Sequence, residues 1–487
     1  MIPSFRNRAF SAIRWTTVSA IAVASMQVVQ TVVLARLLSP ADFGLMALAS
    51  AVTGIMLILG DIGLGKALIH FPDQPGEIRA SLYWANLILS VVVAAVGIVL
   101  APVLADLFSQ QLAPVLQCTA LALPISAFGQ QARALAEKQL RFLDLAINEV
   151  SSALLGTLLA CVAAVNGSGV FALVIGMLTT VSCNALLARL RLHLHEGPRF
   201  RMQYREIRSF AKYGVVLVGD TLITALNRNA DILIGGAFAQ PSALGFYSVP
   251  RDLSLKVALV VNPIASRVGF PIMSLIREDR ERLARIYAMA ASLTGAINFP
   301  IYICLGIFAP QFVELLYGPA WAPAGTYLRI LAAWGLMRSI SNPVGSLLFA
   351  TGKGRRALIW NLVAMAAFLP ALWYGTMKWG LEGLAFTMLF LQSVIFLPGW
   401  LFLIRPVAGL TLSRYVIALG RPLIAAGVAG AFALLMGAMV LNSTGRLLVG
   451  ILCFALAYAG ISWKTNREIF AVLGELSTMR RRAAGKS

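Results

Sequence analysis

The sequence predicts an all-α polytopic membrane protein with about fourteen membrane-spanning helices, and three observations support this fold class. The 487 residues are 59% hydrophobic and only 12% charged, whereas a soluble globular protein has about 25% charged residues. The mean hydropathy is +0.81. Apolar stretches of about 20 residues, long enough to cross a bilayer as helices, recur along nearly the whole chain. Lipid is therefore the expected solvent for most of this protein.

The apolar stretches can be assigned to successive spans, with edges located to within about four residues. The predicted spans are 13–38, 42–66, 81–105, 112–136, 142–165, 169–190, 209–238, 243–272, 285–308, 324–349, 356–377, 381–404, 414–440 and 445–463. The second, seventh and eighth exceed what a straight helix needs, so we expect them to tilt or bend. Three prolines favour a bend in the eighth, namely Pro250, Pro263 and Pro271.

Basic residues are unevenly divided between the loops. The net charge is +20, from 40 Lys and Arg against 20 Asp and Glu. One set of alternate loops is rich in Lys and Arg, whereas the other set contains only Arg36, Lys378 and Arg446. Because cytoplasmic loops carry the basic excess, we expect the rich loops and both termini in the cytoplasm. The charge therefore indicates topology and not nucleic-acid binding.

Several kinds of site are not expected. The five cysteines and three histidines have no metal-ligand spacing, so no metal or cofactor is predicted. The segment from Gly60 to Lys66 has the spacing of a phosphate-binding loop, but Ala67 replaces the Ser or Thr that would hold Mg²⁺. The outer loops are short and contain no catalytic constellation, so the protein is not expected to be an enzyme.

An internal repeat is visible when the sequence is shifted by 201 residues. Pro40 and Gly44 in the outer hairpin of the first two spans then align with Pro241 and Gly245 in the outer hairpin of the seventh and eighth. Six spans separate the copies, and an even number gives both copies the same orientation in the membrane. The repeat predicts two parallel six-helix lobes, residues 1–206 and 207–405, followed by two extra C-terminal helices and a basic tail in 406–487.

Ionisable residues within the predicted spans indicate a polar lining, because a charge at mid-bilayer costs about 2.5–3.5 kcal/mol on insertion scales. Most of them lie in the second lobe, at steps of three, four or seven that share a helix face. The candidate substrate-binding residues of a cationic cavity are Arg228, Arg251, Lys256 and Arg338, with Gln27 and Gln30 from the first span. The candidates for ion coupling or charge pairing are Asp61, Asp220, Asp231 and Asp252.

Two interpretations of these groups remain open. In the first, the charges are ion pairs that fix helix packing, and the glutamines bond neighbouring helices. In the second, the basic groups receive an anion, and the glutamines bind sugar hydroxyls. Arginine suits phosphate because its planar guanidinium donates two parallel hydrogen bonds. Arg228 and Arg251, near mid-depth on adjacent spans, are the leading candidates.

The outer turn from Leu34 to Gly44, followed by Gly60-Asp61-Ile62-Gly63-Leu64, resembles the Wzx-type polysaccharide flippases of the multidrug/oligosaccharidyl-lipid/polysaccharide exporter superfamily. The resemblance implies transfer of undecaprenyl-pyrophosphate-linked oligosaccharides from the inner to the outer leaflet of a bacterial inner membrane. It also implies alternating access between the two lobes. Two ways to drive the transfer remain open, namely the membrane potential and coupling to H⁺ or Na⁺. Membrane lipid and other polysaccharide assembly proteins are the further partners we consider. The first lobe lacks the mid-depth arginine that the family leads one to expect in the first span.

Two transporters of the same superfamily are alternatives. A cation-coupled multidrug exporter is expected to have an acidic cavity, which the basic excess disfavours. A peptidoglycan lipid-precursor flippase is also expected to have a basic cavity for an acidic headgroup. Its loss is expected to be lethal.

Overall fold

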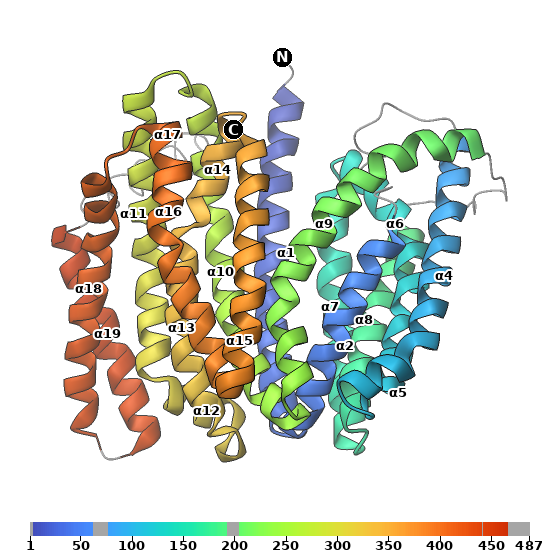
Figure 1. The fold of residues 1–487 in the computed structure, drawn as a ribbon, viewed down its shortest axis with the longest axis horizontal. Helices are drawn as coiled ribbons and strands as arrows, with labels where there is room; N and C mark the ends of the chain where they lie inside the picture. Colours follow the sequence, from blue (N-terminus) through green and yellow to red (C-terminus); the bar gives the residue numbers. More distant parts are fainter. Residues whose placement is uncertain (1–2, 62–75, 192–203, 441, 466–487) are drawn as a thin grey trace. The chain divides into compact units, whose positions relative to one another are not determined.

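A computed structural model of the protein describes the backbone of residues 3–61, 76–191, 204–440 and 442–465. Side-chain surroundings are described within 14–61, 77–191, 218–219, 221–257, 273–440 and 442–463. All secondary structure in these segments is helical, which confirms the all-α prediction (Figure 1). The chain divides into two compact units, Met1–Val249 and Pro250–Ser487. The predicted lobe boundaries at residues 206 and 405 stay a prediction.

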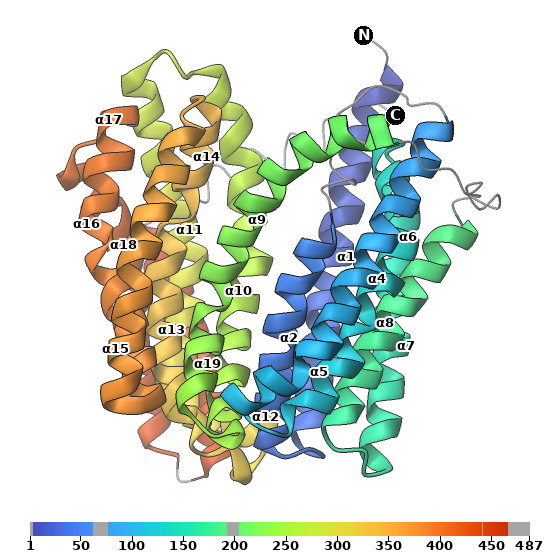
Figure 2. The same ribbon diagram turned by 45° about the vertical axis from the view of Figure 1, so that its right-hand side comes forward.

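The first unit contains eight complete helices among its described residues, together with the start of α10. They are α1 (Pro3–Ala35), α2 (Pro40–Gly60), α4 (Gly76–Leu107), α5 (Leu112–Ala120), α6 (Ala122–Lys138), α7 (Phe142–Val165), α8 (Val170–Arg191) and α9 (Tyr204–Phe238), with α10 at Pro241–Leu275. Within this unit α7 lies beside α8, and α9 passes along α2 and α4 (Figure 2).

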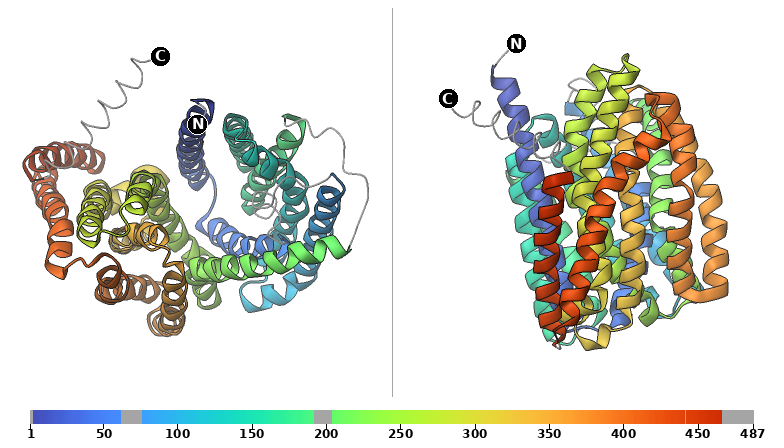
Figure 3. Two further views of the ribbon diagram at one scale, coloured as in Figure 1. Left: turned by 90° about the horizontal axis from the view of Figure 1, so that it is seen from above. Right: turned by 90° about the vertical axis from the view of Figure 1, so that its left-hand side faces the viewer.

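The second unit continues α10 and adds a further set of helices. They are α11 (Arg280–Ile307), α12 (Ala309–Tyr317), α13 (Ala324–Ile340), α14 (Asn342–Ala350), α15 (Gly354–Val394), α16 (Phe396–Gly399), α17 (Arg405–Ala408), α18 (Leu412–Ala438) and α19 (Ser443–Thr465). The predicted extra helices are α18 and α19, which pack together while α18 lies against α11 (Figure 3).

Ten helices among the described residues are long and apolar enough to cross a membrane. One of them, Gly354–Ala408, has 55 residues, far more than the roughly 20 that one crossing needs. It bends at Trp379 and Gly380, and Gly380 has φ 63°, which glycine adopts without steric cost. This bend separates the predicted spans 356–377 and 381–404. The predicted seventh, eighth and tenth spans are also helical, while the total of fourteen stays a prediction.

Two predicted spans are interrupted. The span predicted over 112–136 is two helices that meet at Leu121, and the one over 324–349 breaks at Ser341. Pro124 and Pro343 follow these breaks. Proline lacks the N–H of the helical ladder, and its ring clashes with the carbonyl four residues earlier. Hydropathy alone does not detect such breaks, because both halves of each span are apolar.

Small residues allow the first-unit helices to approach closely. On α7 the residues Ala153, Gly156, Ala160 and Ala164 are buried at steps of three and four, which places them on one face. Because lipid tails are as apolar as leucine, close packing and not hydrophobicity must hold such helices together. A buried hydrogen bond adds to this between α2 and α5, where the hydroxyls of Thr53 and Thr119 lie 2.9 Å apart.

The two repeated turns contact each other through matching residues. A Cβ atom built on Gly44 would lie 1.8 Å from the carbonyl oxygen of Pro241, and one built on Gly245 would lie 1.8 Å from that of Pro40. Glycine is therefore required at both positions by the close approach of two backbones. The contact is reciprocal, as a two-fold relation between the repeated turns requires, and the first turns of α2 and α10 both begin here.

The turn before α2 has the additional support of a capping box. The hydroxyl oxygen of Ser39 accepts from the backbone N–H of Asp42 (3.4 Å), and the backbone N–H of Ser39 donates to the Asp42 carboxylate (2.9 Å). These bonds satisfy donors that a helix start otherwise leaves without partners. They fix the point at which α2 begins, and with it the position of Gly44.

Candidate functional site

Arg251, one of the two leading candidates, is buried on α10. The residue is only 6% exposed, and its Nη1 atom lies 3.4 Å from Oδ1 of Asp252. The Asp252 side chain is 59% exposed, so this carboxylate reaches the surface of its unit. A buried guanidinium needs partners for its donors, because an uncompensated charge in a low-dielectric interior is costly. The ion pair supplies one such partner.

The other basic candidates lie at less buried positions. Arg228 on α9 and Arg338 in the last turn of α13 are exposed, and Lys256 on α10 is half-buried. The Arg338 guanidinium lies 5.1 Å from the ring centroid of Trp334, within the range of a cation–π interaction. Arg228 belongs to the first unit and the other three to the second. Their joint lining of one cationic cavity stays a prediction.

Asp231 is a buried carboxylate on α9 with a phenolic partner. It is 2% exposed and accepts a hydrogen bond of 2.8 Å from the hydroxyl of Tyr247, which is itself fully buried. The bond joins α9 to the first turns of α10 across the connection at residues 239–240. Asp231 thus contributes to the structure of the hairpin, whatever else it does.

Replacing Tyr247 by phenylalanine is expected to destabilise this hairpin. The substitution keeps the ring but removes a donor from a buried carboxylate, which costs about 1–3 kcal/mol. We expect a lower midpoint of thermal unfolding for the purified Tyr247→Phe variant. Tyr374→Phe, at a residue that is 54% exposed, is the matched control and should unfold like the wild type. Equal melting of the two variants would show that the bond contributes little.

The two glutamines of α1 differ in their surroundings. Gln27 is exposed. Gln30 is half-buried, and its Oε1 accepts a hydrogen bond of 3.4 Å from the hydroxyl of Thr157 on α7. Its Nε2 lies beside Gly176 of α8, at 3.2 Å from a Cβ built there. Gln30 therefore takes part in helix packing, the first of its two predicted roles, whereas Gln27 is the glutamine whose side chain is more accessible.

Of the remaining acidic candidates, Asp61 and Asp220, the structure describes only the side chain of Asp61. The side chain of Asp220 lies outside the described residues. Asp61 is the C-cap of α2 and lines a cavity of about 320 Å³ inside the first unit. Ligand pockets in proteins have volumes of about 300–1,000 Å³. The cavity is thus large enough for a small ligand.

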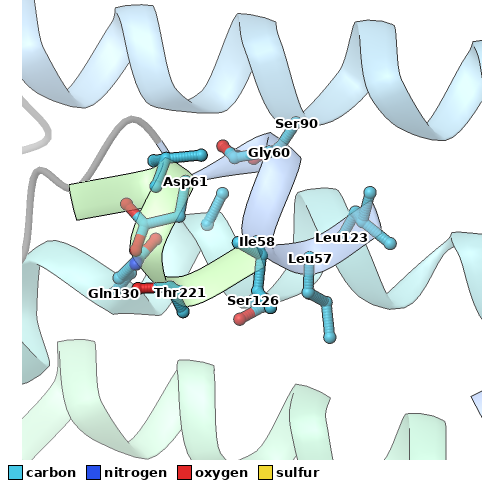
Figure 4. A pocket seen from close by; sticks show the side chains of 11 residues that line it. Leu57, Ile58, Gly60, Asp61, Ser90, Leu123, Ser126, Gln130 and Thr221 are labelled. Atoms are coloured by element: carbon cyan, nitrogen blue, oxygen red, sulfur yellow. Dashed lines mark hydrogen bonds between the residues drawn. The ribbon is translucent and has the colours of Figure 1, made fainter. Parts of the chain in front are cut away.

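Four helices contribute to this cavity (Figure 4). The polar lining consists of Asp61 after α2, Ser90 on α4, Ser126 and Gln130 on α6, and Thr221 on α9. The apolar lining comes mainly from Leu57, Ile58, Leu123 and Val218. In Figure 4 the Asp61 carboxylate, the Gln130 amide and the Thr221 hydroxyl point toward one another. The cavity thus combines an apolar wall with a group of converging polar side chains.

Hydrogen bonds behind the wall orient two of these groups. Nδ2 of Asn86 donates to Oε1 of Gln130 (2.9 Å), and Asn86 is 5% exposed. The Ser90 hydroxyl donates to the carbonyl oxygen of Gly60 (3.1 Å). The Gln130 oxygen accepts from Asn86 and has a second lone pair, while the amide nitrogen supplies donors to the lining. The cavity therefore presents both acceptors and donors.

Sequence reasoning selected Asp61 but missed the other polar residues of the cavity. A signal was present, since Asn86 and Ser90 on α4, and Ser126 and Gln130 on α6, are each four residues apart in apolar helices and so share a face. Among the described side chains, no group of three or more His, Cys, Asp or Glu could hold a metal ion.

Proteins of polysaccharide biosynthesis are similar to this chain along most of its length. Residues 33–326 match the family described as "Polysaccharide biosynthesis protein". The chain is 27% identical over 420 residues to the lipopolysaccharide biosynthesis protein WzxC of Escherichia coli (strain K12), covering 86% of this chain and 85% of that protein. It is 24% identical over 475 residues to the succinoglycan biosynthesis transport protein ExoT of Rhizobium meliloti (strain 1021), covering 96% and 95%.

Solved structures share the fold at low sequence identity. The lipid II flippase MurJ in an inward closed conformation superimposes with a TM-score of 0.76 at 12% identity, covering 95% of this chain and all of that one. An inward-facing multidrug transporter of the MATE family, in the MOP superfamily, gives a TM-score of 0.63 at 13% identity, covering 81% and 98%. The arrangement of membrane helices predicted from the sequence is thus that of a known transporter fold.

Proposed function

Because the chain belongs to the polysaccharide biosynthesis protein family, we propose that it moves lipid-linked oligosaccharide units across a membrane as a flippase. The substrate we propose is undecaprenyl pyrophosphate carrying an oligosaccharide, for exopolysaccharide or lipopolysaccharide synthesis. The protein would lie in the bacterial inner membrane with both termini in the cytoplasm. It would carry the headgroup from the inner to the outer leaflet by alternating access, while the polyprenyl tail stays in lipid.

The observation that carries this proposal is the family match over residues 33–326, which extends from the end of α1 into α13. The matched region consists of helices, several of them long and apolar enough to cross a membrane, and further such helices follow it. WzxC and ExoT, which the chain resembles over at least 85% of their lengths, are named for lipopolysaccharide biosynthesis and succinoglycan transport. Neither name describes an enzymatic reaction, and a transporter is the function that suits a protein built almost entirely of membrane helices.

The basic candidates would replace the hydration that the pyrophosphate loses on entering the protein. Charge-assisted hydrogen bonds from Arg228 and Arg251 suit this purpose, with Lys256 and Arg338 adding positive charge. Gln27 remains a candidate contact for sugar hydroxyls. Since the cell interior is negative, each net negative charge that moves outward gains about 2.3 kcal/mol per 100 mV. The membrane potential could thus drive part of the transfer.

Coupling to H⁺ or Na⁺ would use a carboxylate that binds the ion and releases it during transport. Asp231 and Asp61 are the candidates, since each is at least partly shielded from solvent. Asp252 pairs with Arg251 and is a candidate for charge pairing, as is Asp220. Other polysaccharide assembly proteins are expected partners, because the flipped unit must be polymerised or exported after transfer.

Deletion of the gene in its native host tests this function. We expect loss of one surface polysaccharide and accumulation of its lipid-linked oligosaccharide in the inner leaflet, where it stays protected from probes added outside the cell. Restored export on expression of the wild-type chain is the positive control. A lethal deletion would instead favour a peptidoglycan lipid-precursor flippase. Unchanged polysaccharide with increased sensitivity to cationic drugs would favour a multidrug exporter.

A further inference from the structure

We propose that the Asp61 cavity, defined by the lining of α2, α4, α6 and α9, binds one sugar residue of the lipid-linked substrate. This inference rests on the proposed function and names the part of the substrate that the first unit recognises. None of the described residues that line the cavity is Lys or Arg. The cavity therefore suits an uncharged polyhydroxyl group better than a pyrophosphate.

The size of the cavity supports this ligand. A volume of about 320 Å³ corresponds to about ten water molecules at roughly 30 Å³ each. This is far more than a dehydrated H⁺ or Na⁺ occupies, and it suits a single sugar ring. All the described residues that line the cavity belong to the first unit.

The hydrogen-bonding pattern of the wall is the second argument. A sugar hydroxyl both donates and accepts, so a site for it needs partners of both kinds. The Asp61 carboxylate accepts, the Gln130 amide nitrogen donates, and the hydroxyls of Ser126 and Thr221 can do either. In Figure 4 three of these groups, from Asp61, Gln130 and Thr221, converge on one region. The leucine and isoleucine side chains supply the apolar surface on which the C–H face of a sugar ring can lie.

The same pattern disfavours a bound metal cation in this cavity, which leaves proton binding as the coupling role of Asp61. An all-protein site for a hard cation uses about six converging oxygen atoms. Two oxygens near this cavity already accept hydrogen bonds, namely Oε1 of Gln130 from Asn86 and the carbonyl of Gly60 from Ser90. Asn86 is buried at 5% exposure on the far side of Gln130, so it holds the amide with its nitrogen available to a ligand.

Binding of defined lipids to the purified full-length protein tests the inference. The probes are undecaprenyl pyrophosphate and the same lipid carrying one glucose, galactose or N-acetylglucosamine, measured by native mass spectrometry. We expect at least one sugar-bearing lipid to bind about tenfold or more tightly than the bare lipid. Thr221→Val, which keeps the side-chain shape, and Gln130→Leu are expected to remove this preference while the affinity for the bare lipid stays unchanged.

The matched control is Thr31→Val on α1. The Thr31 hydroxyl donates to the backbone carbonyl of Gln27 in its own helix (2.8 Å) and does not line the cavity. This variant should keep the sugar preference. Equal affinities for all four lipids, or a preference that survives both cavity substitutions, would overturn the sugar site but leave the flippase proposal intact. A preference replaced by a sodium requirement in the same variants would assign the cavity to a cation. Failure of every lipid to bind would overturn the proposed function itself.

Discussion

Polysaccharide export is expected to fall about ten- to one-hundredfold when Arg251 is replaced by glutamine, with the protein still present in the membrane. In the proposed function, the substitution removes charge-assisted hydrogen bonds to the pyrophosphate, each worth about 1.5–3 kcal/mol. Arg228→Gln is expected to act in the same direction. Export is measured as surface polysaccharide in a deletion strain that expresses each variant, and membrane protein is quantified by immunoblot.

The matched control for this series is Arg285→Gln on α11. Arg285 lies 3.6 Å from Glu281, and both side chains are 76% exposed, so the pair is worth little and export should be unchanged. The double variant Arg251→Gln/Asp252→Asn separates binding from packing. If Arg251 served only as the partner of Asp252, removal of both charges would restore export. Normal export in both Arg251→Gln and Arg228→Gln would contradict the assignment of these residues to the substrate.

Gly44→Ala is expected to disrupt the contact between the two repeated turns. The added Cβ would lie 1.8 Å from the Pro241 carbonyl oxygen, and the clash is with backbone that cannot rotate away. Overpacking of this kind costs about 1–3 kcal/mol or more. We expect a lower melting midpoint and loss of export, and Gly245→Ala should reproduce both effects because its Cβ would meet the Pro40 carbonyl at the same distance.

Gly54 provides a control within the same helix. A Cβ built there has no neighbour within 4 Å, and alanine in place of a helical glycine stabilises by about 0.5–1 kcal/mol. Gly54→Ala should therefore melt at the wild-type temperature or slightly above it. If Gly44→Ala and Gly54→Ala behaved alike, the turns would not be held by the close approach of their backbones.

The spans could be predicted from the sequence because lipid imposes a simple rule. Every backbone polar group in hydrocarbon must be satisfied within the segment, so each long apolar stretch is a helix. The bend at Trp379 and Gly380 lies between the predicted spans 356–377 and 381–404, where one apolar stretch ends and the next begins. The breaks at Leu121 and Ser341 were missed, since proline positions and not hydropathy determine them. The alignment of Pro40 and Gly44 with Pro241 and Gly245 indicated a repeat, but not that the two turns contact each other.

The candidate site was only partly predictable. Charged residues such as Arg251 and Asp231 are conspicuous in an apolar sequence because each is costly to bury. Neutral residues such as Ser126 and Thr221 give a weaker signal, since serine and threonine are common in helix packing and a shared face does not tell packing from binding. Their convergence with Asp61 depends on how four helices pack, which no single helix face reveals. Gln30, considered both for the substrate and for helix packing, contacts α7 and α8, and its role toward the substrate stays a prediction.

The contact between Gly44 and Gly245 has an evolutionary consequence. Each turn presents the same patch to the other, so the interface is isologous, like that of a homodimer with two-fold symmetry. A half-length ancestor of six spans, present as two identical copies, would already have possessed this interface without any further mutation. Fusion of the duplicated halves would then have left them free to diverge, with charges gathering in one half and neutral polar groups in the other.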